Sequence, residues 1–222
     1  LQKDLKIPLL CKKVFTFSPD TYMSPLFLPR RLLNNIVMKV KEKYKDDQIF
    51  RFRPRVNNNV NGHFICDEGR LSYHEENKNR FTTALINKTE TNISNTITNM
   101  FKELTTKDNI FFVLSPNLSI EEMQNVNNLA NKLNARVSGY SPDTFDDNFK
   151  DDYLKTNDRS ANRAAFKELE INEEEAYFTK KLSDSTLVII IDNNYFDDNL
   201  ELLKNKKVIS LFSHHCLTIG NS

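Results

Sequence analysis

The feature that most constrains the fold is the alternation of short apolar runs with amphipathic helical patterns in residues 84–222. The most apolar run is Leu187–Ile191, and its lack of alternating polar residues is typical of a central strand that is buried on both faces. Another apolar strand, Ile110–Leu114, is followed by a helical pattern and by a short strand near Val137. This order predicts a right-handed parallel crossover, and the lobe is therefore predicted to be α/β with a parallel sheet.

Amphipathic patterns predict the helices of this lobe. A helix that begins near residue 93 has one apolar face, formed by Ile93, Ile97, Met100, Phe101 and Leu104. Ser119 and Glu122 form a capping box before a second helix. The inward face of the second helix is predicted to contain Met123, Val126, Ala130 and Leu133. Further predictions are helices at 161–169, 174–182 and 200–203, a last strand at 208–212, and an acidic loop at 146–152.

Residues 1–83 have a different pattern. Prolines at positions 19, 25 and 29 exclude a long regular element in that stretch. Alternating apolar residues at 36–40 and 49–52 predict a hairpin, with turn chemistry at Asp46-Asp47 between the two strands. We therefore expect two domains, a small irregular strand-containing lobe at residues 1–83 and the α/β lobe at residues 84–222.

Composition limits the classes of function. Charged residues make up 27% of the chain and the net charge is +1, so nothing in the overall charge favours nucleic acid. The longest apolar run is far shorter than the roughly 20 residues of a membrane helix. Cys11, Cys66 and Cys216 lie far apart, which argues against a disulfide framework and against a zinc or iron–sulfur motif. No glycine-rich loop follows the strand that ends at Leu114, so a dinucleotide site is not expected there.

Residue usage also carries a bias. Asn, Lys, Ile, Phe and Leu are abundant, whereas glycine occurs four times and tryptophan does not occur. The enriched residues are those with AT-rich codons. This bias indicates an AT-rich bacterium or an organelle genome as the source of the sequence.

Several polar groups are candidate sites. His214, His215 and Cys216 suggest a metal site. In a strand, His214 and Cys216 would share one face and His215 would point away, and two ligands make an incomplete metal site. The paired carboxylates Asp46-Asp47 and Asp151-Asp152 are interpreted as turns. Arginines at positions 51, 53 and 55 alternate with phenylalanines as in an RNA-binding strand, but pairing with carboxylates is the preferred interpretation and no nucleic-acid partner is expected.

One segment carries a specific motif. Residues 53–73 contain, in order, Arg53-Pro54-Arg55, Asn57, Asn61, Phe64 and Cys66-Asp67-Glu68-Gly69-Arg70-Leu71-Ser72-Tyr73. The motif resembles the signature Pro-Arg, Asn, Asn, aromatic, Cys-Asp-x-Gly-Arg-x-x-Tyr of the large iron–sulfur subunit of NADH:quinone oxidoreductase, respiratory complex I. Weaker resemblances continue at residues 151–163 and 211–222. The resemblance implies a Rossmann-like parallel-sheet lobe similar to molybdopterin oxidoreductases.

The resemblance also implies a lost cluster. In many bacterial members the cysteine at the position of Cys66 is the fourth ligand of a four-iron cluster. The other three ligand positions fall at Phe27, Arg30 and Asn34, and none of these side chains can replace a thiolate at iron. We therefore expect Cys66 to be a vestigial ligand position, inert and buried rather than reactive, and we expect no catalytic residue, metal or cofactor in this chain.

A function follows from the resemblance as an expectation. The chain would be a non-catalytic structural part of the peripheral arm of complex I, and the iron–sulfur clusters would belong to its partner subunits. The chief partner would be the ferredoxin-like, cluster-bearing part of the same subunit, lying against residues 1–30, and membrane association would occur only through the complex. The expected location is the matrix side of the mitochondrial inner membrane, with the cytoplasmic face of a bacterial plasma membrane as the alternative. The rival hypotheses are a small stand-alone molybdopterin- or metal-dependent oxidoreductase and an unrelated interaction module.

Overall fold

The structure, a computed structural model, describes residues 49–50, 52, 58, 70–71, 73–78, 83–87, 89–152, 156–212 and 214. The chain divides into two compact units: Leu1–Lys78 with Asn117–Ser119 and Thr144–Ala165, and Asn79–Pro116 with Ile120–Asp143 and Phe166–Ser222. The predicted hairpin in residues 36–52 lies outside the described residues except at Ile49, Phe50 and Phe52. The predicted division after residue 83 stays a prediction.

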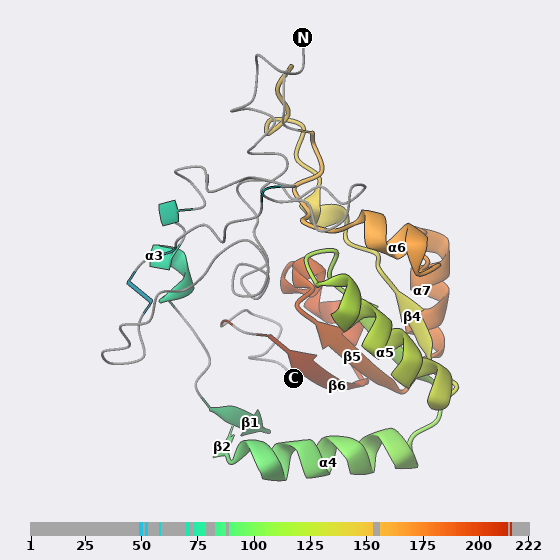
Figure 1. Cartoon of the computed structure of the whole chain (residues 1–222). Coiled ribbons are helices and arrows are strands. Elements are labelled where there is room, and N and C mark those ends of the chain that lie inside the picture. Colours follow the sequence, from blue (N-terminus) through green and yellow to red (C-terminus); the bar gives the residue numbers. More distant parts are fainter. Residues whose placement is uncertain are drawn as a thin grey trace. The chain divides into compact units, whose positions relative to one another are not determined.

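The second unit contains a four-stranded parallel sheet, as predicted (Figure 1). Its strand order is β4-β3-β5-β6. The bounds are Ile110–Leu114 for β3, Arg136–Ser138 for β4, Leu187–Ile191 for β5 and Lys207–Leu211 for β6. All neighbouring pairs are parallel, and Phe112 of β3 lies between Val137 of β4 and Ile189 of β5. The α/β class is therefore confirmed.

The two central strands, β3 and β5, form the core of the sheet. Every residue of both strands is buried, whereas the edge strand β6 is only partly covered. A strand buried on both faces needs apolar residues on both, which explains why neither run alternates with polar residues. The prediction that Leu187–Ile191 is central and buried is confirmed.

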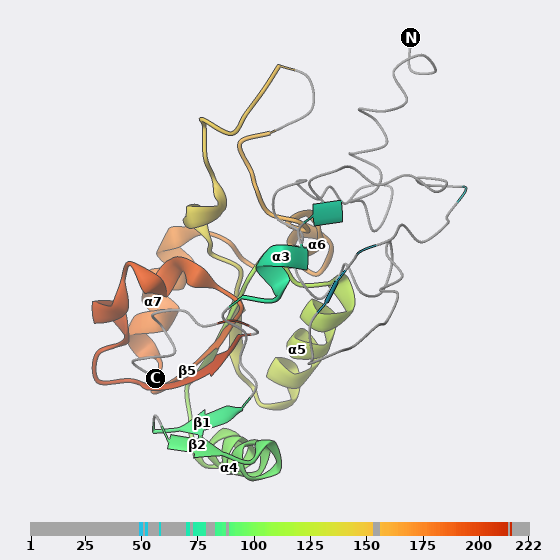
Figure 2. The ribbon, with the colours of Figure 1, turned by 90° about the vertical axis from the view of Figure 1, so that its left-hand side faces the viewer.

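Helices cover both faces of this sheet. Figures 1 and 2 show α5, Ile120–Lys132, on one face and α7, Glu175–Asp184, on the other. Met123 and Ala130 of α5 are buried, as predicted for its inward face, and Val126 and Leu133 are half-buried. Phe178 and Leu182 of α7 pack on alternate residues of the strands; these strand residues are Phe111, Val113, Val188 and Ile190.

Short helices connect the larger elements. The connection from β5 to β6 contains two 3₁₀ helices, Asn194–Asp197 (η3) and Leu200–Leu203 (η4). The helix predicted at residues 200–203 is therefore present, but with 3₁₀ geometry. The described part of the chain also contains the short helices α3, Tyr73–Glu76, α6, Ala164–Glu168, and η2, Pro142–Thr144.

An antiparallel hairpin precedes α4 and was not predicted. Strands β1, Ala84–Ile86, and β2, Thr89–Thr91, are joined by a two-residue loop that includes Asn87 at a φ of 48°. Helix α4, Ile93–Thr106, begins where the side chain of Asn92 accepts a hydrogen bond from the Ser94 N–H at 2.8 Å. The predicted helix is thus confirmed, and an asparagine cap starts it.

Left-handed backbone conformations occur at the ends of several elements. Among the residues that the structure describes, four asparagines adopt a positive φ: Asn87, Asn109, Asn134 and Asn205. Glu170 and Asp192 do so as well. Asn and Asp tolerate this region better than other residues with a side chain, so they serve at turns where glycine is usual.

Candidate functional site

The carboxyl ends of β3 and β5 are the first candidate position for a site. In the strand order β4-β3-β5-β6, the chain leaves β3 for β4 on one side of it, whereas it leaves β5 for β6 in the opposite direction across the sheet. This reversal is a topological switch point, where open α/β sheets commonly bind ligands. The residues that follow the strands here are Ser115, Gly139 and Asp192-Asn193.

The side chain of Asn193 fills this position. Its Nδ2 atom donates to Leu114 O at 2.9 Å, to Tyr140 O at 3.2 Å and to Ser141 Oγ at 2.7 Å. Its Oδ1 atom accepts from the Tyr195 N–H at 3.1 Å and so caps η3. Asn193 is 1% exposed. One buried amide therefore connects the ends of β3 and β5 to the segment that follows β4.

Aromatic rings pack beside Asn193. The ring of Tyr140 stacks on Phe178 with centroids 4.8 Å apart, and Tyr195 meets Tyr140 edge-on at 5.3 Å. Burial raises the pKa of both tyrosine hydroxyls, and the charge of Glu175 raises it further. Both hydroxyls are therefore neutral at physiological pH, and the rings serve as packing groups.

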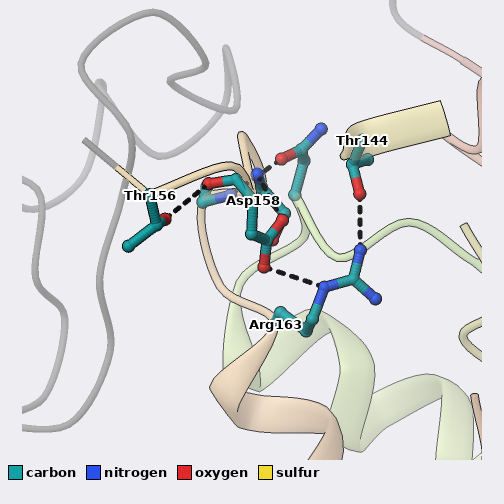
Figure 3. Close-up of polar contacts among 7 residues, drawn as sticks. Thr144, Thr156, Asp158 and Arg163 are labelled. Carbon is teal, nitrogen blue, oxygen red and sulfur yellow. Dashed lines mark hydrogen bonds and ion pairs between the residues drawn. The ribbon is translucent and has the colours of Figure 1, made fainter. Parts of the chain in front are cut away.

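A polar cluster in the first unit is the second candidate site (Figure 3). Arg163 Nε lies 2.9 Å from Asp158 Oδ2, and Arg163 Nη2 donates to Thr144 Oγ1. The guanidinium also lies over the ring of Phe145, 4.5 Å from its centroid. The hydroxyl of Thr156 donates to the backbone oxygen of Asp158 at 3.1 Å. Arg163 therefore links Asp158 to the segment that contains Thr144 and Phe145.

Backbone groups complete this cluster. Asp158 Oδ1 accepts from the Ser160 N–H at 2.9 Å, and Asn117 Oδ1 accepts from the Ala161 N–H at 2.9 Å. Asn162, which is fully buried, donates to Leu118 O at 3.0 Å. The last two of these bonds join residues 117–118 to residues 161–162. The arrangement supports a structural role, because the carboxylate and the guanidinium are engaged with each other.

Most of the predicted site residues lie outside the described residues. These are Cys66, the three lost-ligand positions Phe27, Arg30 and Asn34, the arginines at 51, 53 and 55, Asp46-Asp47, His215, Cys216 and residues 1–30. His214 is described and is buried. Asp151 and Asp152 are exposed in the segment before residue 153, in agreement with the loop prediction.

Metal ligands and membrane helices are two further features that bear on function. Within the described part of the chain, no group of three or more His, Cys, Asp or Glu side chains could hold a metal ion. None of the helices described above is long and apolar enough to cross a membrane.

The sequence did not point to Asn193 or Tyr140. The polar pair Asp192-Asn193 follows an all-apolar strand, and this is a signal that could have identified Asn193, because a polar side chain at a buried strand end must find hydrogen-bond partners. No protein-family model matches the chain, and no curated protein sequence matches it.

Proposed function

We propose that this chain is a non-catalytic structural part of the peripheral arm of respiratory complex I. The observation that carries the proposal is the motif at residues 53–73, which resembles the signature of the large iron–sulfur subunit and leaves Cys66 without companion thiolates. A single thiolate cannot hold a four-iron cluster. The chain would therefore contribute shape and contacts, and its partners would carry the electrons.

The geometry at the switch point supports a structural role. The position where such sheets commonly bind ligands holds the Asn193 amide and the rings of Tyr140 and Tyr195. Asn193 is 1% exposed and uses its amide on strand ends. A small molecule could bind through the Asn193 amide only if these hydrogen bonds broke first.

The proposed fold relationship and location follow from the same resemblance. The parallel sheet is proposed to correspond to the Rossmann-like lobe of molybdopterin oxidoreductases. The proposed partners are the peripheral-arm subunits, chiefly the ferredoxin-like part with the iron–sulfur clusters. The AT-rich residue usage favours the matrix side of the mitochondrial inner membrane.

Co-purification tests the assignment. The chain is tagged in its native source, membranes are solubilised in mild detergent, and the captured material is assayed for NADH oxidation and for its protein content. The expected result is capture of an NADH-oxidising assembly that contains a ferredoxin-like protein with iron–sulfur clusters. Capture of the chain free of any NADH-oxidising assembly would overturn the proposal.

Iron analysis separates the proposal from the stand-alone oxidoreductase. The purified chain should show neither stoichiometric iron nor molybdenum, nor iron–sulfur absorbance, and Cys66→Ala should not change the metal content. Cys11→Ala is the matched control, since it removes a thiol that the motif does not include. The stand-alone oxidoreductase would be favoured if metal remained after chelation and if Cys66→Ala, but not Cys11→Ala, removed that metal.

A further inference from the structure

We draw no further inference here: the strongest candidate, the exposed apolar row of Ile93, Ile97 and Phe101 along one side of helix α4, carries nothing because no described part of the structure shows what covers it.

Discussion

Replacing Gly139 by alanine should destabilise the parallel-sheet unit through one steric conflict. Gly139 follows β4 directly, and its N–H donates to Asn172 O at 2.9 Å. A Cβ atom added there would lie 2.3, 2.5 and 2.7 Å from three carbons of the Phe166 ring. Carbon atoms pack at about 3.5–4.0 Å, so the ring would have to move by about 1 Å or more. Phe166 is fully buried, so its ring can move only if the side chains packed around it also shift.

The magnitude follows from two opposing effects. Overpacking of a filled core costs about 1–3 kcal/mol. Gly→Ala at a compatible φ stabilises by about 0.4–1 kcal/mol, because the unfolded chain loses freedom. The free energy of unfolding of Gly139→Ala should therefore fall by about 1–2 kcal/mol, and the melting temperature by about 2–8 °C.

A double-mutant cycle identifies the cause. Unfolding in urea is followed by circular dichroism for the unaltered chain, Gly139→Ala, Phe166→Leu and the double variant. Leucine removes the ring atoms that the new Cβ would meet, so the double variant should be more stable than the sum of the single changes predicts, by about 1 kcal/mol. Strict additivity, or a stability of Gly139→Ala within about 0.5 kcal/mol of the unaltered chain, would refute the steric argument.

Three further predictions concern other parts of the same unit. Ile189→Asp places an unpaired charge in the central strand and should unfold the sheet; fast amide exchange at 187–191 in the unaltered chain would contradict this. Asn193→Asp removes the two N–H groups of Nδ2, which Leu114 O, Tyr140 O and Ser141 Oγ share. It should lower the free energy of unfolding by about 2–4 kcal/mol at pH 7 and by less at pH 4, where a protonated carboxyl can donate, whereas Asn194→Asp, at an exposed position, should change it little. The hydrogen bond from Lys207 holds the pKa of Glu103 below its ordinary value of 4.5, so the pair stabilises the fold above that value and this stabilisation is lost as pH falls below it. Glu103→Gln should therefore reduce the fall of the thermal midpoint at acid pH. An unchanged dependence of the midpoint on pH would exclude the Glu103–Lys207 pair as the cause of that fall.

The central strands could be predicted because a strand that is buried on both faces requires an uninterrupted run of apolar residues. Ile110–Leu114 and Leu187–Ile191 are the two all-apolar runs, and both are central strands. The hairpin of β1 and β2 has no comparable pattern in the sequence. Its loop contains Asn87 but no glycine, so the usual sign of a tight hairpin turn is absent from the sequence.

Side-chain contacts between distant segments could not be predicted. Asn193 is hydrogen-bonded to residues 52 to 79 positions away, and Arg163 reaches Thr144 across 19 positions. No periodicity encodes such pairs. The apolar face of α4 is a related case, because a helical pattern shows which side chains share a face but not what covers them. Amphipathic helices and central strands could therefore be predicted from the sequence, whereas the hydrogen bonds of Asn193 and Arg163 could not.

The left-handed asparagines have a consequence for the unfolded chain. A glycine at Asn87, Asn109, Asn134 or Asn205 would adopt the positive φ without strain, but it would also give the denatured chain many more backbone conformations. An asparagine is somewhat strained in the folded turn, but it has fewer backbone conformations than glycine in the denatured chain. These two effects oppose each other. A polypeptide with four glycines among 222 residues can therefore still make tight turns without a large loss of backbone entropy at each of them.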